Sequence, residues 1–400
     1  MNSEWPNWAE LRRRSEQRYS PAGVAAVARC IDMLEGHLGK SWPRKQVERR
    51  GWLPNELLML GHHVAALPAF LTFALRVDSV TVEPTFEEVL QDLKRGVDTA
   101  TWRHVLLQLE VSRAWEAASE TITFEPRIAD APRKADLRIR ASRTFLVETT
   151  SLSRSMADRR WEELEHSLWM RIQSIQARTG ALIDVEMAVD VAPDALEAWL
   201  IEVERVASKT SQDRPTIVTS DVGQASIRRD QNNDPGSTFH GSLRTTDGWF
   251  RLARTLVDKA RQSSGEEPVW LRVDALDGFF QLTEWPSLSW PERVSRLSEA
   301  THYALEGADH LAGLVLSSSK GVAIGATNAT QVDNRFDAES GTGLRRLIAP
   351  HVARETAIIP LNPAADAEHR VWADAYSAEP DWLDEDLGLA GMPPLAEFVR

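Results

Sequence analysis

The sequence predicts an α/β protein, with a mixed sheet flanked by helices and preceded by an N-terminal helical domain. From about residue 102 onward, stretches with apolar residues at helical spacing alternate with short apolar runs typical of strands. That alternation is characteristic of α/β layer structures. Hydrophobic residues make up 42% and charged residues 26% of the 400 residues, the ordinary balance of a chain that buries a sizeable core.

The first hundred residues carry helical patterns only. Segment 22–38 has apolar residues at helical spacing, and segment 85–95 follows Pro84, a residue that favours the first turn of a helix. Segment 55–75 is largely apolar and predicts a buried pair of helices around Pro68. We therefore expect a helical domain that ends at about residue 100.

Residues 101–360 are expected to form the α/β domain. The predicted helices span about 102–118, 155–178, 193–208, 248–263 and 291–306. The predicted strands span about 121–125, 135–140, 144–150, 181–190, 215–220, 268–276 and 311–318, with 321–327 and 356–361 as further strands. The stretch 221–247 is rich in Gly, Asn, Asp and Ser and predicts a mobile loop.

Charge is unevenly distributed along the chain. The formal net charge is −13, so nucleic acid is not attracted to the protein as a whole and any such contact has to be local. Residues 1–51 hold ten Lys/Arg against six Asp/Glu and are the favoured phosphate-facing surface. Residues 361–400 hold nine Asp/Glu against two Arg, and we expect this acidic tail to lie over the surface.

Several sequence features favour a cytoplasmic protein with no membrane partner. No run of about 18 apolar residues exists, so no membrane span is expected. The first twenty residues lack the apolar core of a secretory signal. A single cysteine, Cys30, forms no intrachain disulfide and fits a reducing compartment.

A predicted hairpin carries two acidic residues. Strands KADLRIR and TFLVETT are joined by a short turn, and a turn centred on Ser142 puts Asp136 directly opposite Glu148. Like charges opposed across a strand pair are destabilising unless something neutralises them. A divalent cation would do so, because Mg²⁺ is usually held by one or two carboxylates, water and a substrate phosphate. Neutralisation by Arg138, Arg140 or Arg143 on a solvated hairpin is the alternative.

Glu110 is a carboxylate on an apolar helix face. Its neighbours at helical spacing are Leu106, Leu107, Ala114 and Ala117. A lone carboxylate is costly in such a place, so a metal ion or a cation is expected beside it. Arg113 or a buried arginine from elsewhere would also satisfy Glu110.

Residues from about 100 to 190 resemble the core of a PD-(D/E)XK nuclease. In that family a helix with a glutamate precedes a strand, a hairpin that carries Asp and Glu-x-Lys, a helix and a further strand. The predicted elements follow in the same order, with the helix 155–178 and the strand 181–190 as the last two. The resemblance implies a restriction-endonuclease-like core.

The same resemblance assigns site residues. Glu110 matches the helix glutamate, Asp136 the motif aspartate and Glu148 the motif glutamate, whereas Thr150 stands where the family has lysine. A neutral threonine does not replace an ammonium, so the lysine role has to come from elsewhere. Two candidates are equally favoured, Lys134 beside Asp136 and Lys259 in a later helix.

The function that the resemblance implies is metal-dependent phosphodiester hydrolysis. Asp136, Glu148 and Glu110 would bind Mg²⁺ or Mn²⁺, and the substrate would be nucleic acid, DNA in the first place. A role in bacterial restriction or defence would follow. The alternative is a catalytically inactive nuclease-fold subunit that works as a binding or assembly module with partner proteins. Thr150 and the net charge of −13 favour this alternative.

Overall fold

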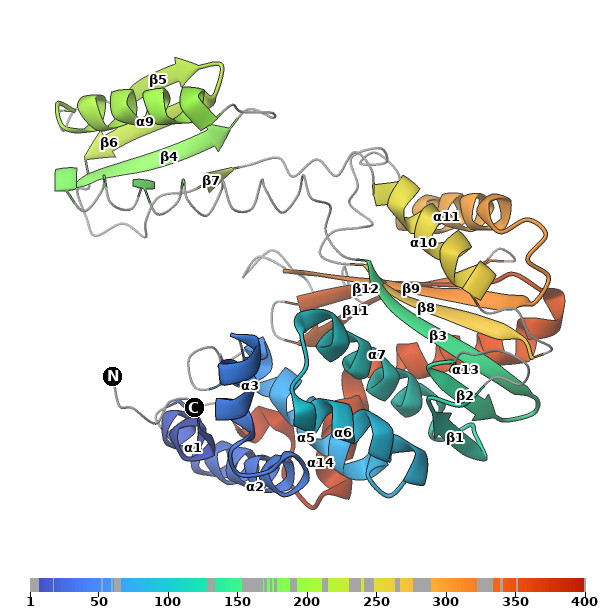
Figure 1. Ribbon diagram of the computed structural model, residues 1–400. Coiled ribbons are helices and arrows are strands. Elements are labelled where there is room, and N and C mark those ends of the chain that lie inside the picture. The colour runs from blue at the N-terminus through green and yellow to red at the C-terminus, as the bar shows by residue number, and fades with distance from the viewer. Residues whose placement is uncertain are drawn as a thin grey trace. The chain divides into compact units, whose positions relative to one another are not determined.

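Residue contacts divide the chain into two units (Figure 1). Unit 1 comprises Met1–Ser153, Phe250–Gln281 and Trp285–Arg400, and unit 2 comprises Arg154–Trp249 and Leu282–Glu284. The computed structural model describes residues 7–16, 18–51, 53–58, 60, 66–127, 134–152, 168, 171–172, 175, 178–187, 193–210, 215–229, 239–240, 248–262, 267–275, 289–321, 334–338, 341–349 and 352–398.

The N-terminal part of unit 1 is helical, as predicted. Its elements are α1 (Trp8–Glu16), α2 (Pro21–Leu38), α3 (Trp42–Arg50), α4 (Asn55–Leu58), α5 (Ala66–Val80), η1 (Pro84–Phe86), α6 (Glu87–Arg95) and α7 (Thr99–Trp115). Three of these helices begin at a side-chain cap, and at the start of α1 the side-chain oxygen of Asn7 accepts the backbone N–H of Glu10. Ser20 accepts the backbone N–H of Gly23 at the start of α2, and Asp98 accepts that of Thr101 at the start of α7. No helix that the structure describes is long and apolar enough to cross a membrane.

These helices do not form a domain that ends at residue 100. Their buried side chains belong to one apolar cluster that runs from Trp8 to Phe398 and includes Trp270 in the sheet. The backbone N–H of Ser20 also donates to the carbonyl of Phe398, at 2.9 Å. The expected boundary is therefore corrected: the chain divides at 153/154 and 249/250, because the apolar faces of the N-terminal helices are covered by the α/β part and the C-terminal segment.

Unit 1 contains a mixed eight-stranded sheet, which confirms the predicted α/β class with a mixed sheet. Its strands, in spatial order, are β1 (Thr121–Phe124), β2 (Leu137–Arg140), β3 (Thr144–Leu152), β8 (Val269–Ala275), β9 (Leu311–Gly321), β12 (Val352–Pro360), β11 (Gly341–Ala349) and β10 (Asn334–Ala338). β3, β8 and β9 pair in parallel, and the remaining pairs are antiparallel. The parallel strands lie at the centre and are buried on both faces, as the apolar run of β8 predicts.

Helices cover both faces of this sheet. Figure 1 shows α7 and α13 (Asp366–Ser377) against one face and α10 (Gly248–Gln262) and α11 (Trp290–Ala304) against the other. α7 packs on β3 and α13 on β12, while α11 packs on β11. Elements far apart in sequence thus meet around β3 and β8.

The helix and strand that follow β3 in unit 1 are α10 and β8, and this corrects a prediction. The helix 155–178 and the strand 181–190 were expected to continue the core after the hairpin. The predicted strand exists as β4 (Ala181–Met187), but it belongs to unit 2. Helix 155–178 lies mostly outside the described residues. Unit 2 is thus inserted between β3 and α10, so elements far along the chain occupy the places that the nearest elements were expected to take.

Unit 2 has its own sheet and core. Its strand order is β5 (Thr216–Ser220), β6 (Gly223–Arg229), β4 and β7 (Phe239–His240), with α9 (Pro193–Ala207) as its helix. Apolar side chains of β4, β6 and α9 form a separate buried cluster. β6 and β7 fall within the stretch 221–247 that was expected to be a loop, and residues 230–238 and 241–247 lie outside the described residues. Residues 322–327 of the predicted strand 321–327 also lie outside the described residues.

The acidic C-terminal segment is part of the core rather than a surface tail. It forms α13, η3 (Pro363–Ala365), η4 (Glu379–Asp381), α14 (Trp382–Leu389) and η5 (Leu395–Glu397). Trp372, Tyr376, Leu387 and Phe398 are fully buried. Net charge misled the prediction, because the acidic residues alternate with apolar ones that point inward at helical spacing.

We expect Gly313→Ala to lower the free energy of unfolding by about 1–3 kcal/mol through overpacking. Gly313 lies beside Trp270 on the neighbouring strand, and a Cβ at Gly313 would be 2.3 Å from the buried ring. Urea denaturation followed by tryptophan fluorescence measures the change. Gly36→Ala is the control. It lies on the exposed side of α2, where an added Cβ meets no described atom within 4 Å, and should stabilise by up to ~1 kcal/mol. Equal stability of Gly313→Ala and wild type would contradict the packing.

Candidate active site

The β2–β3 hairpin brings two carboxylates close enough for the charge of Asp136 to raise the pKa of Glu148. Leu137 pairs with Val147 and Arg140 with Thr144, so the turn is centred on Ser142, as predicted. Continuing this register by one residue puts Asp136 opposite Glu148. The expected juxtaposition therefore depends only on a short turn, a local feature that the sequence specifies.

Asp136 is held by the strand opposite. Asp136 precedes the first residue of β2, and its Oδ2 accepts the backbone N–H of Thr149 at 2.5 Å and the Thr149 hydroxyl at 3.0 Å. The side chain is only 15% exposed. A carboxylate fixed by a backbone amide keeps its orientation, because the strand that carries the amide is itself buried.

His104 of α7 lies on the other side of the Asp136 carboxylate. Its Nε2 is 3.3 Å from Asp136 Oδ1, and its Nδ1 is 3.0 Å from the Thr149 hydroxyl. Gln108, one helical turn later, places its amide nitrogen 3.2 Å from His104 Nε2 and 3.5 Å from the Asp136 carbonyl. Helix α7 thereby connects to the hairpin through polar side chains at four-residue spacing.

Glu148 is paired with a lysine from the opposite face of the sheet. The Nζ atom of Lys259 on α10 donates to Glu148 Oε2 at 3.2 Å. Both side chains are largely removed from solvent, with 21% of Lys259 and 8% of Glu148 exposed. Successive side chains on a strand point to opposite faces. Accordingly, Thr149 contacts α7 whereas Glu148 contacts α10.

The surroundings of Asp136 and Glu148 shift the pKa values of their carboxyl groups in opposite directions. For Glu148, burial and then the charge of Asp136 raise the pKa, and Lys259 offsets this only in part. For Asp136, burial also raises the pKa, but the hydrogen bond with His104 and the charges of His104 and Lys259 bring it below its usual range. Burial would lower the pKa of His104, yet its bond to Asp136 raises it overall. Asp136 is thus the carboxyl group that ionises first, and Glu148 holds its proton longer.

Glu110 makes its contacts elsewhere. Its Oε1 accepts hydrogen bonds from Arg272 at 2.7 and 3.0 Å and from the Tyr376 hydroxyl at 2.6 Å, and its Oε2 accepts one from Arg354 at 2.9 Å. The charges of these arginines outweigh the effect of burial and lower the pKa of Glu110 to about 2. Of the two expectations for this residue, the structure favours buried arginines rather than a metal site shared with Asp136 and Glu148.

The two lysines that the sequence left equal are distinguished by their contacts. Lys259 reaches Glu148, whereas Lys134 pairs with Glu88 and, at 3.3 Å, with Glu125. Thr150 lies one place past Thr149 on β3, half-buried and on the same strand face as Glu148. Thr150 is therefore a neutral side chain on this face, and the ammonium beside Glu148 comes from α10.

Two of the three hairpin arginines pair with carboxylates other than Asp136 and Glu148. Arg138 pairs with Glu267 at 2.9 Å and Arg143 with Glu368 at 2.5 Å. In the part of the chain that the structure describes, no three His, Cys, Asp or Glu side chains lie close enough together to form a metal site on their own. A metal ion at Asp136 and Glu148 would therefore complete its coordination with water and a substrate phosphate, as Mg²⁺ commonly does.

His104, Gln108 and Thr149 were missed by sequence reasoning. His104 and Gln108 are four residues apart on the helix before the hairpin, and that spacing is the one signal that marks them. It is weak, because α7 is apolar on most sides and the sequence does not tell which face meets the hairpin. The sequence does not indicate the role of Thr149, because that role depends on its hydroxyl and its backbone amide facing Asp136 in the folded protein.

Comparisons with known proteins add no family to this geometry. No protein-family model, curated protein or solved structure matches the chain. What the site does is therefore inferred from its own residues and their contacts.

Proposed function

We propose that this chain is a metal-dependent nuclease of the PD-(D/E)XK type. The observation that carries the proposal is the 3.2 Å contact between Lys259 and Glu148, beside Asp136. The charges of Asp136 and Lys259 both act on Glu148, which supports a site with two acids and a lysine near one another, although Lys259 is 111 residues away from Glu148 in sequence. Nucleophilic and electrostatic roles depend on position in space, so a lysine from another element serves equally well.

The order of elements supports the same proposal. With unit 2 set aside, α7, β1, β2, β3, α10 and β8 follow the order helix, strand, hairpin, helix, strand that the family resemblance implies. The restriction-endonuclease-like core is thus part of the proposal, with α10 and β8 in place of the elements first expected. Fold alone does not determine activity, and the site chemistry has to agree with it.

The donor set fits a hard divalent cation, Mg²⁺ or Mn²⁺. Asp136 and Glu148 offer carboxylate oxygens, the ligands these ions prefer. The raised pKa of Glu148 also means that additional positive charge is favourable there. A bound ion would stabilise negative charge on the phosphate and lower the pKa of an attacking water. In the hydrolysis that would follow, the water oxygen would bond to phosphorus as one ester P–O bond breaks, and the proton lost by the water would be taken up by the leaving oxygen.

The chain's own residues have distinct parts in this reaction. Lys259 holds an ammonium beside Glu148, where it would bind the phosphate and offset its developing charge. His104 and the Thr149 amide fix Asp136 in one orientation. Because His104 contacts Asp136 and the substrate is expected to contact the ion, His104 acts here as a positioning residue.

A second candidate function is a nuclease-fold subunit without catalysis that binds nucleic acid or a partner protein. One observation favours it. Lys259 and His104 already compensate Glu148 and Asp136 inside the protein, so the hairpin is electrostatically satisfied without a metal ion. The two candidates differ in metal binding, which only the nuclease requires.

The first test is Mn²⁺ binding and DNA cleavage by the Asp136→Ala/Glu148→Ala variant. We expect wild type to bind Mn²⁺ in titration calorimetry and to cleave DNA, and the variant to lose both because both ion ligands are gone. Glu87→Ala/Glu88→Ala removes two exposed carboxylates of α6 and should behave as wild type. DNA binding by wild type without metal-dependent turnover would favour the catalytically inactive subunit instead.

The lysine role is tested by a matched pair of variants. Lys259→Ala should lower the cleavage rate by about 10²–10³-fold, the usual cost of removing one charge-stabilising donor. Lys134→Ala should leave the rate near that of wild type, since Lys134 contacts Glu88 and Glu125. Single-turnover cleavage at saturating Mg²⁺ measures both. Equal losses in the two variants would count against the assignment of Lys259.

Metal affinity should rise with pH. Glu148 is protonated below its pKa, which lies above the ordinary carboxyl value of 4.5, and His104 is positively charged below its pKa, which lies above 6.5. A protonated Glu148 and a positively charged His104 both disfavour a bound cation. Mn²⁺ binding should therefore tighten as the pH rises above the pKa of Glu148, and again as it rises above the pKa of His104. Titration calorimetry across this range measures the effect. In His104→Gln the upper phase should disappear, and an unchanged profile in that variant would exclude His104 as its source.

A further inference from the structure

Arg103 of α7 is a half-buried cation that has no hydrogen bond or ion pair with any residue that the structure describes. It is the immediate neighbour in sequence of His104, which contacts Asp136. None of its nitrogen atoms is a buried atom without a partner, so each of them is accessible to solvent and to a ligand. A partly desolvated guanidinium without a counter-charge is unfavourable, which points to an anion from outside the chain.

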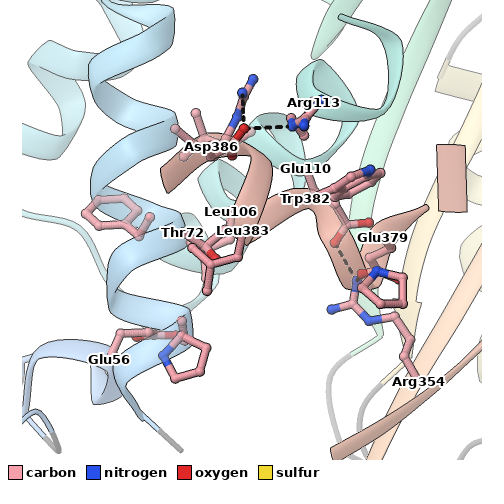
Figure 2. A pocket seen from close by; sticks show the side chains of 16 residues that line it. Glu56, Thr72, Leu106, Glu110, Arg113, Arg354, Glu379, Trp382, Leu383 and Asp386 are labelled. Atoms are coloured by element: carbon pink, nitrogen blue, oxygen red, sulfur yellow. Dashed lines mark hydrogen bonds and ion pairs between the residues drawn. The ribbon is translucent and has the colours of Figure 1, made fainter. Parts of the chain in front are cut away.

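The face of α7 that carries Arg103 is turned toward the sheet. Arg103 lies seven residues before Glu110, which is two helical turns, so the two side chains leave the same face of the helix. Figure 2 shows the carboxylate of Glu110 pointing toward Arg354 of β12, and the two groups are 2.9 Å apart. Arg103 therefore projects over the sheet, nearer the start of α7.

The start of α7 lies at the carboxyl end of β3. Trp115, the last residue of α7, packs on Phe145 near the beginning of β3, with ring centroids 4.8 Å apart. His104, near the start of the helix, contacts Thr149 farther along the same strand. The helix thus runs antiparallel to β3, and Arg103 lies at the end of the strand where ligands of α/β sheets commonly bind.

Asp274 marks the carboxyl end of the neighbouring strand, β8. It is the register partner of Ser151 on β3, and it lies on the α7 face because it follows Arg272 by two residues. Burial raises the pKa of the Asp274 carboxyl group, and the charge of Arg103 opposes this rise. Arg272 and Arg354 oppose it more strongly than Arg103 does. Arg103 is thus close to the ends of β3 and β8, without being the main counter-charge of Asp274.

We infer that Arg103 binds a backbone phosphate of nucleic acid at the carboxyl ends of β3 and β8, beside the phosphate expected at Asp136 and Glu148. A guanidinium suits this role, because it donates two parallel N–H groups to phosphate oxygens. A contact with the backbone positions the strand and reads no base. The inference rests on the proposed function, which supplies nucleic acid as the ligand, but it concerns binding and not catalysis.

The test is the salt dependence of DNA binding, measured by fluorescence anisotropy with a short duplex in EDTA, so that no metal-dependent cleavage occurs. Loss of one phosphate contact lowers the slope of log K against log salt by about one. We expect this change in Arg103→Ala, with binding about tenfold weaker because a hydrogen bond to a charged group is lost. Duplexes of unrelated sequence should be affected equally. Arg103→Lys should keep the wild-type slope, since it keeps the charge.

Arg370→Ala is the matched control. Arg370 is an exposed arginine of α13 that pairs with Asp366. Its neighbour Glu368 pairs with Arg143 beside the turn of the β2–β3 hairpin, so this part of α13 lies at the amino end of β3. Arg370→Ala should leave both slope and affinity unchanged. Duplexes with and without terminal phosphates distinguish the source of the anion. A loss confined to terminally phosphorylated DNA would overturn the assignment to a backbone phosphate.

Stability provides a check on the variant itself. Arg103→Ala should melt no lower than wild type, because no hydrogen bond or ion pair described within the chain is lost. Unchanged slope and affinity in Arg103→Ala, or no DNA binding by wild type, would overturn the inference. Wild type that binds DNA through Arg103 but does not cleave it with Mg²⁺ would instead overturn the proposed nuclease and leave the phosphate contact standing.

Discussion

The buried charge of Arg272 is the constraint on which the arrangement of unit 1 depends. This side chain is completely inaccessible to solvent, in the middle of β8 at the centre of the sheet. A buried guanidinium is tolerated only when carboxylates and other acceptors surround it. Glu110 of α7 and Tyr376 of α13 supply them, and Arg354 of β12 shares Glu110. The central strand, two helices and another strand therefore have to meet at one point.

The same constraint positions the candidate active site. Glu110 fixes α7 against β8, and His104 lies on α7 six residues earlier, where it contacts Asp136 and Thr149. Arg272 and Thr149 are register partners on neighbouring parallel strands. The helix glutamate that a nuclease resemblance assigns to the metal site thus has a different physical task here, which is to compensate a buried arginine and so to hold the helix that carries His104.

The two sides of the sheet contribute to the site in different ways. The α7 side supplies His104, which keeps Asp136 ionised, and the α10 side supplies Lys259, which compensates Glu148. Because Asp136 ionises more readily than Glu148, the pair carries one charge more easily than two. A second positive charge close to this pair, from a metal ion or a basic partner, would stabilise the doubly ionised form.

The sequence by itself determined the local features. Apolar spacing placed most helices and strands, and the short turn at Ser142 set the register that opposes Asp136 and Glu148. An apolar face around Glu110 predicted that some cation lies beside it. Each of these depends on residues close together in the chain. Only the tertiary structure decided that the cation is Arg272 with Arg354, that Lys259 rather than Lys134 reaches Glu148, and that α10 and β8 follow β3 in the sheet. These outcomes depend on how distant elements pack, and an insertion of a whole unit between β3 and α10 leaves no local pattern that reveals which later elements return to the core.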